Sequence, residues 1–188
     1  MIINSKYNFL IPLRVKKLIR LGRNFDGGYL VCENTLKYCE NLITFGVGDD
    51  LSFEIDFYKK VKKKKIYLFD YTVNHNLFLR IILKYLRRLT TFRSKFKNLT
   101  YSIQNYYNFV KFINKNNVFF YKLRVVKKIQ KKFDIKLCKI FEKINSKNNL
   151  LKIDIEGSEY EILDDIFKQS SKINMLIIEF HWINKNKK

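Results

Sequence analysis

The sequence predicts a single α/β domain built on a mostly parallel sheet with helices on both of its faces. From residue 41 onward, short apolar runs typical of strands alternate with segments of helical spacing. The chain has 188 residues, which is enough for one core and too few for two ordinary domains. Its single proline leaves no Pro-rich linker. We therefore expect one domain over residues 1–188.

The first 40 residues form an N-terminal extension in this interpretation. The run RLGRNFDGGYLVCE, from Arg20 to Glu33, reads as two short strands joined by a turn. Asp26, Gly27 and Gly28 supply the residue types that tolerate the positive φ angles of a tight hairpin. The extension should therefore contain a small hairpin that precedes the core.

The core, residues 41–188, should contain five strands. They are expected at residues 41–45, 65–69, 118–126, 150–155 and 175–183. Helices are expected between them, because parallel strands need crossover connections. Phe53 and Phe57 predict a helix over Ser52 to Lys60.

Two later helices are also expected. A basic stretch after residue 126 carries apolar residues on one helical face, and these are Ile135, Cys138, Phe141 and Ile144. Another helix begins near Ser158.

A helical insertion is expected at about 74–117, a stretch too long for a simple connection. Its NLFLRIILKYLRRL part is apolar nearly all round, with four interspersed cations, Arg80, Lys84, Arg87 and Arg88. One interpretation is a helix packed over the sheet edge. The other is a basic amphipathic helix over 77–89 that makes a peripheral contact with a membrane surface.

The chain carries 38 basic and 17 acidic residues, a net charge of +21. Such a surplus is typical of proteins that bind nucleic acid or an anionic membrane. It also follows from AT-rich codons, which encode the abundant Lys, Asn, Ile, Phe and Tyr, so both explanations stay open. No apolar run approaches the roughly 20 residues of a membrane span, and no signal peptide is recognisable. Three cysteines without a CxxC pair predict reduced thiols in a cytoplasmic protein.

A glycine pair follows the first core strand. Gly46 and Gly48 would let a ligand approach the backbone beside a helix N-terminus, although a tight structural turn explains them too. Asp70 ends the next strand, at the place where nucleotide-binding folds bind ribose hydroxyls. Asp49 and Asp50 disfavour a bound pyrophosphate by charge repulsion, so they favour the cationic S-adenosylmethionine over NAD.

The run LLKIDIEGSEYEIL places four carboxylates at the end of the fourth core strand. Ser158 and Glu161 match a capping box, and Glu159 would complement the helix dipole. Asp154 and Glu156 share the other strand face and lie where strand gives way to loop. That rim is the ligand-binding edge of an open parallel sheet.

The last strand, MLIIEFHWI, repeats this arrangement because Glu179 and His181 alternate with apolar neighbours. If the last two strands are adjacent, these two residues would converge with Asp154 and Glu156. Such a set suits a divalent metal or a general base for a hydroxyl. For His181, a partly buried hydrogen-bonding role is the alternative.

These runs, with FGVGDDLSFE and RNFDGGYLV upstream, resemble the FkbM-type methyltransferases over roughly residues 20 to 183. These are S-adenosylmethionine-dependent enzymes with a class I, Rossmann-like fold. The resemblance implies O-methylation of a hydroxyl, often on a sugar, glycolipid or natural product. It also implies that Gly46, Gly48 and Asp49 line the cofactor, with Asp70 at its ribose and Asp154 near the methyl donor. Because that fold normally continues to a sixth and seventh strand, we expect a C-terminally short member.

Methyl transfer is an in-line displacement, so the protein mainly has to align donor and acceptor and remove the acceptor's proton. We expect Asp154 or His181 to act as the base or as a metal-linked activator, with Glu156 and Glu179 orienting. Two alternatives remain open at this point. One is an RNA-directed methyltransferase, and the other is a non-catalytic relic that binds nucleic acid or membrane through its basic surface.

Overall fold

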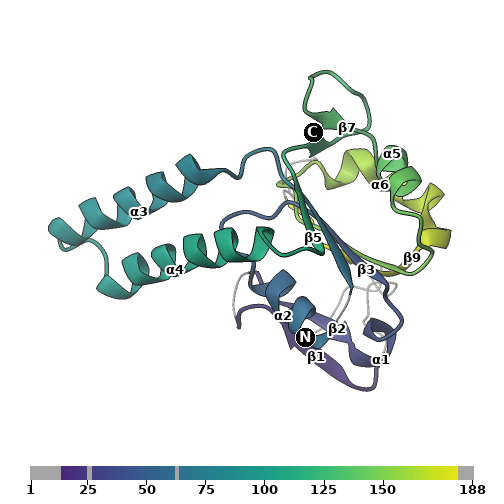
Figure 1. Cartoon of the computed structure of the whole chain (residues 1–188), viewed down its shortest axis with the longest axis horizontal. Helices are drawn as coiled ribbons and strands as arrows, with labels where there is room; N and C mark the ends of the chain where they lie inside the picture. Colours follow the sequence, from purple (N-terminus) through teal and green to yellow (C-terminus); the bar gives the residue numbers. More distant parts are fainter. Residues whose placement is uncertain (1–13, 25–26, 62–63, 182–188) are drawn as a thin grey trace, which may run out of the picture.

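A computed structural model describes residues 14–24, 27–61 and 64–181. Its centre is a sheet of five strands in the order β5-β4-β3-β8-β9, and every neighbouring pair is parallel (Figure 1). The strands are β3 (Asn41–Phe45), β4 (Lys65–Phe69), β5 (Val118–Tyr121), β8 (Asn149–Ile153) and β9 (Ile173–Ile178). The predicted α/β class with a mostly parallel sheet is confirmed.

The two faces of the sheet are covered separately. Successive strand residues point to opposite faces, so Leu42 of β3 belongs to one apolar core while Ile43 and Phe45 belong to the other. Helix α2 (Ser52–Lys60) packs on the first face through Phe53 and Phe57. Helices α5 (Leu137–Lys143) and α6 (Glu159–Lys168) pack on the second. All five residues of β3 are buried, as expected for a parallel strand covered on both sides.

The predicted N-terminal hairpin is also present. Strands β1 (Leu18–Leu21) and β2 (Tyr29–Cys32) pair antiparallel, and the short helix α1 (Glu33–Leu36) follows. Asp26 of the predicted turn lies outside the described residues. The hairpin packs against α2 through β1, and Tyr29 of β2 reaches Asp154, which directly follows β8.

Three predicted strand boundaries are wrong. The run 118–126 divides into β5 and a separate two-residue strand, β6 (Arg124–Val125), which pairs with β7 (Asp134–Ile135). The chain turns away after Tyr121 because Arg124 binds Asp134 through two hydrogen bonds, of 2.9 and 3.2 Å. Strand β8 ends at Ile153 and β9 at Ile178, before the side chains of the predicted site. Residues 182–183 of the predicted last strand lie outside the described residues.

The basic helix is also shorter than predicted. Ile135 belongs to β7, and α5 begins at Leu137. The face that α5 buries consists of Leu137, Ile140 and Phe141, whereas Cys138 is only partly buried. The short 3₁₀ helix η2 (Ser170–Lys172) leads from α6 into β9.

The insertion forms a helical hairpin of α3 (His75–Thr90) and α4 (Phe96–Ile113), which projects away from the sheet (Figure 1). Helix α3 packs along α4, with the rings of Phe78 and Phe109 4.8 Å apart. It is α4 that reaches the edge strand, through Phe109 and Phe120. The interpretation that α3 covers the sheet edge is therefore wrong. Among the helices that the structure describes, none is both long enough and apolar enough to cross a bilayer.

Candidate active site

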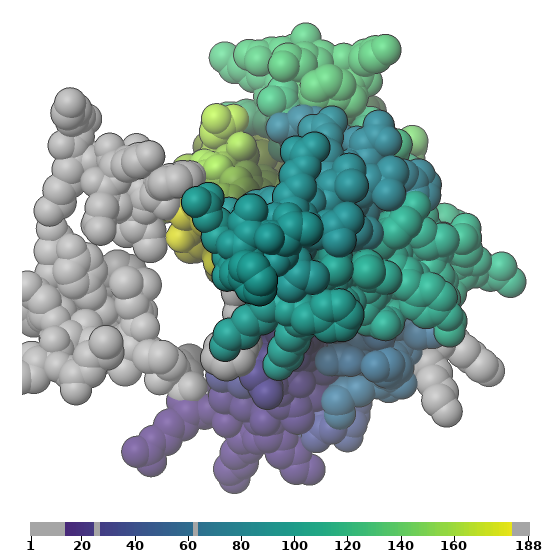
Figure 2. Space-filling view, turned by 90° about the vertical axis from the view of Figure 1, so that its left-hand side faces the viewer, coloured from purple at the N-terminus to yellow at the C-terminus, as the bar shows by residue number. Residues whose placement is uncertain are grey.

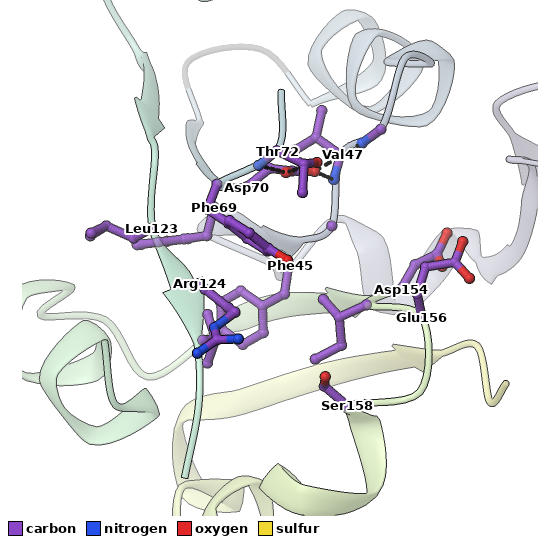
Figure 3. A pocket seen from close by; sticks show the side chains of 15 residues that line it. Phe45, Val47, Phe69, Asp70, Thr72, Leu123, Arg124, Asp154, Glu156 and Ser158 are labelled. Carbon is purple, nitrogen blue, oxygen red and sulfur yellow. Dashed lines mark hydrogen bonds between the residues drawn. The ribbon is translucent and has the colours of Figure 1, made fainter. Parts of the chain in front are cut away.

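A cavity of about 330 Å³ opens at the carboxyl ends of β3, β4 and β8 (Figure 3). Its size lies within the range of roughly 300–1,000 Å³ of small-molecule sites. One wall is apolar and includes Phe69, Leu123 and Val125. The acidic side chains of Asp154 and Glu156 lie at another side. The cavity can therefore hold a ligand that combines an apolar ring with a positive charge.

The glycine loop after β3 lines this cavity, and its predicted contact with a cofactor stays a prediction. Gly46 has a φ of +79°, and a Cβ there would collide with the carbonyl oxygen of Asp154. The loop is pressed against the end of β8, where the Asp154 amide donates to the Phe45 carbonyl at 2.9 Å. Gly48 has a φ of +61° and open space where its Cβ would stand. Gly46 thus serves close packing of two loops, and Gly48 leaves the backbone accessible to a ligand.

Asp70 lies at the predicted rim and joins two loops. Its Oδ2 accepts hydrogen bonds from the amides of Val47 and Gly48, at 2.8 and 3.1 Å. Its Oδ1 accepts from the amide and hydroxyl of Thr72 and from the amide of Val73. Figure 3 shows this carboxylate between the loops that follow β3 and β4. Since the chain itself engages both oxygens, a ribose contact of Asp70 stays a prediction.

The two aspartates after Gly48 lie outside the cavity lining. Asp50 faces the N-terminal hairpin, where its Oδ2 lies 2.6 Å from Arg23 Nε and its Oδ1 accepts from the Ser52 amide. This ion pair neutralises the charge of Asp50. Asp50 would therefore repel a pyrophosphate less than the sequence predicted. The predicted contact of Asp49 with a cofactor stays a prediction.

Four carboxylates surround the imidazole of His181. Its Nδ1 lies 2.9 Å from Glu159 Oε1. Its Nε2 lies 3.6 Å from Asp154, 3.7 Å from Glu179 and 3.9 Å from Glu156. The structure therefore brings the predicted residues together at one rim. Glu179 and His181 reach it from the segment after β9, where the Glu179 amide donates to the Ile153 carbonyl at 3.0 Å.

Glu159 is the site residue whose role the sequence did not reveal. It is fully buried, and its Oε1 also accepts from the Ile155 amide at 3.0 Å. Its Oε2 is buried without a hydrogen-bond partner among the described residues. The predicted capping box of Ser158 and Glu161 is wrong, because Ser158 has helical backbone angles and makes no side-chain cap. Glu159 therefore binds the segment before the helix and the imidazole, instead of only complementing the dipole.

The environment of His181 favours its protonated form. Burial opposes the positive charge, but the hydrogen bond to Glu159 and the charges of Glu156, Glu159 and Asp154 outweigh it, so the pKa of His181 is raised. Burial likewise raises the pKa of Asp154, against the attraction of Lys152. His181 and Asp154 thus both hold their protons more tightly than the isolated side chains would.

Tyr29, from the N-terminal hairpin, is a second residue that sequence reasoning missed. Its hydroxyl lies 2.5 Å from Glu179 Oε2 and 3.1 Å from Asp154 Oδ2. Burial, together with these two carboxylates, raises the pKa of Tyr29. One hydroxyl proton is thus shared between two acceptors. Tyr29 falls within the run RNFDGGYLV, but no local pattern shows that it reaches the end of β8.

A buried ion pair lies beneath this cluster. Lys152 Nζ is 3.2 Å from Glu54 Oε1, which also accepts from the Thr44 hydroxyl at 3.1 Å. The same ammonium lies 5.3 Å from the centroid of the Tyr29 ring, in cation–π range. Lys152 alternates with Asp154 along the chain, and its charge favours the ionised carboxylate above it.

A metal could be held by Asp154, Glu156 and His181, whose ligand atoms lie within 4.8 Å of one another. Carboxylate oxygens with an imidazole nitrogen suit a divalent ion. Carboxylates also cluster around a protonated histidine without any metal. The geometry alone therefore does not identify an ion here, and the divalent metal stays a prediction.

An open parallel sheet with a glycine loop and rim carboxylates defines a class of α/β enzymes that bind nucleotide-like ligands at this edge. Residues 21–188 match the methyltransferase FkbM domain, so the chain belongs to this family and is a methyltransferase. The resemblance is confirmed. Neither a curated protein nor a solved structure matches the chain in the corresponding comparisons.

The family implies S-adenosylmethionine as the methyl donor, and the cavity fits such a ligand. Its apolar wall suits an adenine ring, and the open backbone at Gly48 allows close approach. The acidic side, with Asp154 and Glu156, suits a sulfonium charge.

Proposed function

We propose that the protein transfers the methyl group of S-adenosylmethionine to a hydroxyl oxygen of a sugar, a glycolipid or a related small molecule. The observation that carries the proposal is that two acidic residues belong both to the cavity lining and to the surroundings of His181. Asp154 and Glu156 line the cavity and also lie 3.6 and 3.9 Å from His181 Nε2. A donor site and a proton acceptor therefore adjoin.

When bound, the cofactor supplies an electrophilic methyl group, whose carbon forms a bond to the acceptor oxygen while its bond to sulfur breaks. The protein has to remove the hydroxyl proton. His181 Nε2 accepts that proton, since Nδ1 donates to Glu159 at 2.9 Å. This hydrogen bond selects the tautomer in which Nε2 is free to accept.

The carboxylates orient the reactants. Asp154 and Glu156 present negative charge to a positive donor, and Glu156 and Glu179 accept hydrogen bonds from a polyhydroxyl acceptor. Tyr29 bridges Asp154 and Glu179, so it fixes their separation. Groups fixed in advance need little reorganisation during the reaction.

Titration calorimetry with S-adenosylhomocysteine tests the cofactor without requiring the acceptor. We expect the full chain to bind it, and Asp154→Asn to bind S-adenosylmethionine more weakly than the wild type does. No binding to the wild type would refute the proposal and would favour the non-catalytic relic.

The acceptor class is tested with a methyl-labelled donor, offered with glycans, glycolipids and RNA in separate reactions. Label in an alkali-stable methyl ether of a glycan or glycolipid supports the proposal, because methyl esters are hydrolysed by alkali. The His181→Ala variant should lose the transfer. Label in RNA instead would establish the RNA-directed alternative.

A divalent metal at Asp154, Glu156 and His181 is the second candidate for hydroxyl activation, supported by the closeness of these ligand atoms. The two mechanisms predict different responses to a chelator. With His181 as the base, EDTA leaves the rate unchanged. With a metal activator, EDTA abolishes transfer and Mg²⁺ or Mn²⁺ restores it.

A further inference from the structure

The α3–α4 hairpin carries an unbalanced positive charge. Residues 75–117 contain no Asp or Glu and nine Lys or Arg. In the part of the chain that the structure describes, none of these nine cations forms an ion pair with a carboxylate. The charge of the hairpin is therefore available to an external anion.

Helix α3 exposes a row of leucines beside this charge. Leu79, Leu83 and Leu86 are 47, 51 and 45% exposed. Their spacing places them on one face, away from Phe78, which is buried against α4. Arg80, with Lys84 and Arg87 at the same spacing, forms an adjacent basic row. An apolar row flanked by cations is the pattern of helices that lie in a bilayer interface.

The end of α3 forms a hollow of about 500 Å³ lined by Arg87, Arg88, Thr91 and Arg93. The turn that shapes it is fixed by the amide of Arg93, which donates to the Arg88 carbonyl at 2.8 Å. Planar guanidinium groups match the oxygens of a phosphate. The hollow thus suits a phosphate group.

Phe92 lies at the tip of the hairpin and is 98% exposed. Its φ of +55° is uncommon for a bulky residue, so the turn presents the ring outward in a strained backbone conformation. Phe96, at the start of α4, is 64% exposed. Figure 2 looks onto this projecting hairpin, in teal, from its tip. Aromatic side chains at a basic tip suit the headgroup region of a bilayer.

We infer that the α3–α4 hairpin docks on an anionic lipid bilayer. The row of leucines and Phe92 enter the interface, and the hollow formed by Arg87, Arg88 and Arg93 binds lipid phosphates. A second copy of the chain does not fit this surface, because two hairpins of the same charge repel each other. RNA would use the cations but leave the exposed leucines in water. This inference does not depend on the methyl acceptor.

Vesicle co-sedimentation with the full chain tests the inference. We expect binding to vesicles of equal parts phosphatidylcholine and phosphatidylglycerol, little binding to phosphatidylcholine alone, and weakening by salt. The variant R87Q/R88Q/R93Q should bind anionic vesicles on the order of 100-fold more weakly. Each cation near the surface raises the affinity for an anionic membrane by roughly fivefold, so the loss of three multiplies. The variant L79S/L83S/L86S should lose affinity for anionic vesicles by on the order of tenfold or more, because less apolar surface enters the bilayer.

The matched control is K37Q/K143Q/K147Q, which removes three exposed cations outside the hairpin, in the segments that end or follow α1 and α5. It should bind vesicles like the wild type, and circular dichroism should show that all variants are folded. Equal losses in the control and the arginine variant would refute the inference, as would no binding to anionic vesicles. The leucine variant also separates a bilayer from RNA. If it binds anionic vesicles and RNA as tightly as the wild type does, while the arginine variant loses RNA binding, the membrane inference is refuted.

Discussion

Glu159 Oε1 lies 2.9 Å from His181 Nδ1, and Glu159 is fully buried while His181 remains partly exposed. The glutamate belongs to the first turn of α6, whereas the histidine follows β9, so this contact fixes the imidazole between two elements. A base held by a buried carboxylate on its far nitrogen is a recurrent arrangement of activated side chains. Here it points Nε2 towards Asp154, Glu156 and Glu179.

Removing the charge of Glu159 should change both the rate and its pH dependence. His181 acts as a base when it is deprotonated, so activity rises as pH passes its raised pKa. In Glu159→Gln this pKa falls, and the acid limb of the rate profile shifts to lower pH. We also expect the maximal rate to fall roughly 100-fold, because the amide no longer selects the tautomer.

Glu161→Gln is the matched control, because this glutamate is exposed on the same helix. Histidine titration by NMR reports the pKa directly. An unchanged His181 pKa in Glu159→Gln would contradict the assigned role, even if activity fell.

Tyr29→Phe should lower the rate of methyl transfer with little loss of fold. The change removes the hydroxyl between Asp154 and Glu179 and leaves two carboxylates facing each other without its proton. The free energy of unfolding should fall by about 1–2 kcal/mol. Tyr38→Phe, on an exposed tyrosine, is the control. Chemical denaturation and steady-state kinetics measure both effects, and a wild-type rate in Tyr29→Phe would count against the bridge.

The two glycines after β3 should respond differently to alanine. At Gly46 the added Cβ collides with the Asp154 carbonyl and the φ is +79°, so Gly46→Ala should destabilise the fold by about 3 kcal/mol or more. At Gly48 only the φ of +61° opposes alanine, at about 1 kcal/mol. Gly48→Ala should therefore stay folded but bind S-adenosylhomocysteine more weakly. Equal thermal stability of the two variants would contradict the packing of the two loops.

Asp134 should make stability depend on acid pH. The hydrogen bond from Arg124 and the amides of Gln130 and Lys131 outweigh burial and lower the pKa of Asp134 to about 2. Because the folded pKa is lowered, the stabilisation is present above the unfolded value of about 4. It is lost as pH falls towards 2. The stability difference between wild type and Asp134→Asn should shrink over that range in urea unfolding, and a constant difference would exclude the ion pair as its source.

His181 should make the stability of the fold depend on pH in the opposite direction. Its folded pKa is raised, so its stabilisation is fully present below the unfolded pKa of about 6.5 and is lost as pH rises through the folded value. Urea unfolding of the wild type and His181→Ala, compared at several pH values, measures this. A difference that grows with rising pH would contradict the assigned contacts.

Much of the fold follows from local sequence. β3, α2 and β4 begin and end where their apolar runs and helical spacing predicted, because strand alternation and helical periodicity depend on near neighbours. The glycine loop and the acidic rim were also predictable, since both directly follow strands of a parallel sheet. The division of the third predicted strand into β5 and β6 was not predictable from the sequence. The separate strand β6 depends on a contact between the side chains of Arg124 and Asp134.

The sequence by itself determined the α/β class, the family and four of the side chains at the rim. The tertiary structure decided which residues complete the site. Tyr29 reaches Asp154 and Glu179 across 125 and 150 residues of chain, because the N-terminal hairpin packs beside the ends of β8 and β9. Glu159 becomes a partner of His181 because β8 and β9 are adjacent. Such contacts depend on strand order and packing, which no local periodicity encodes.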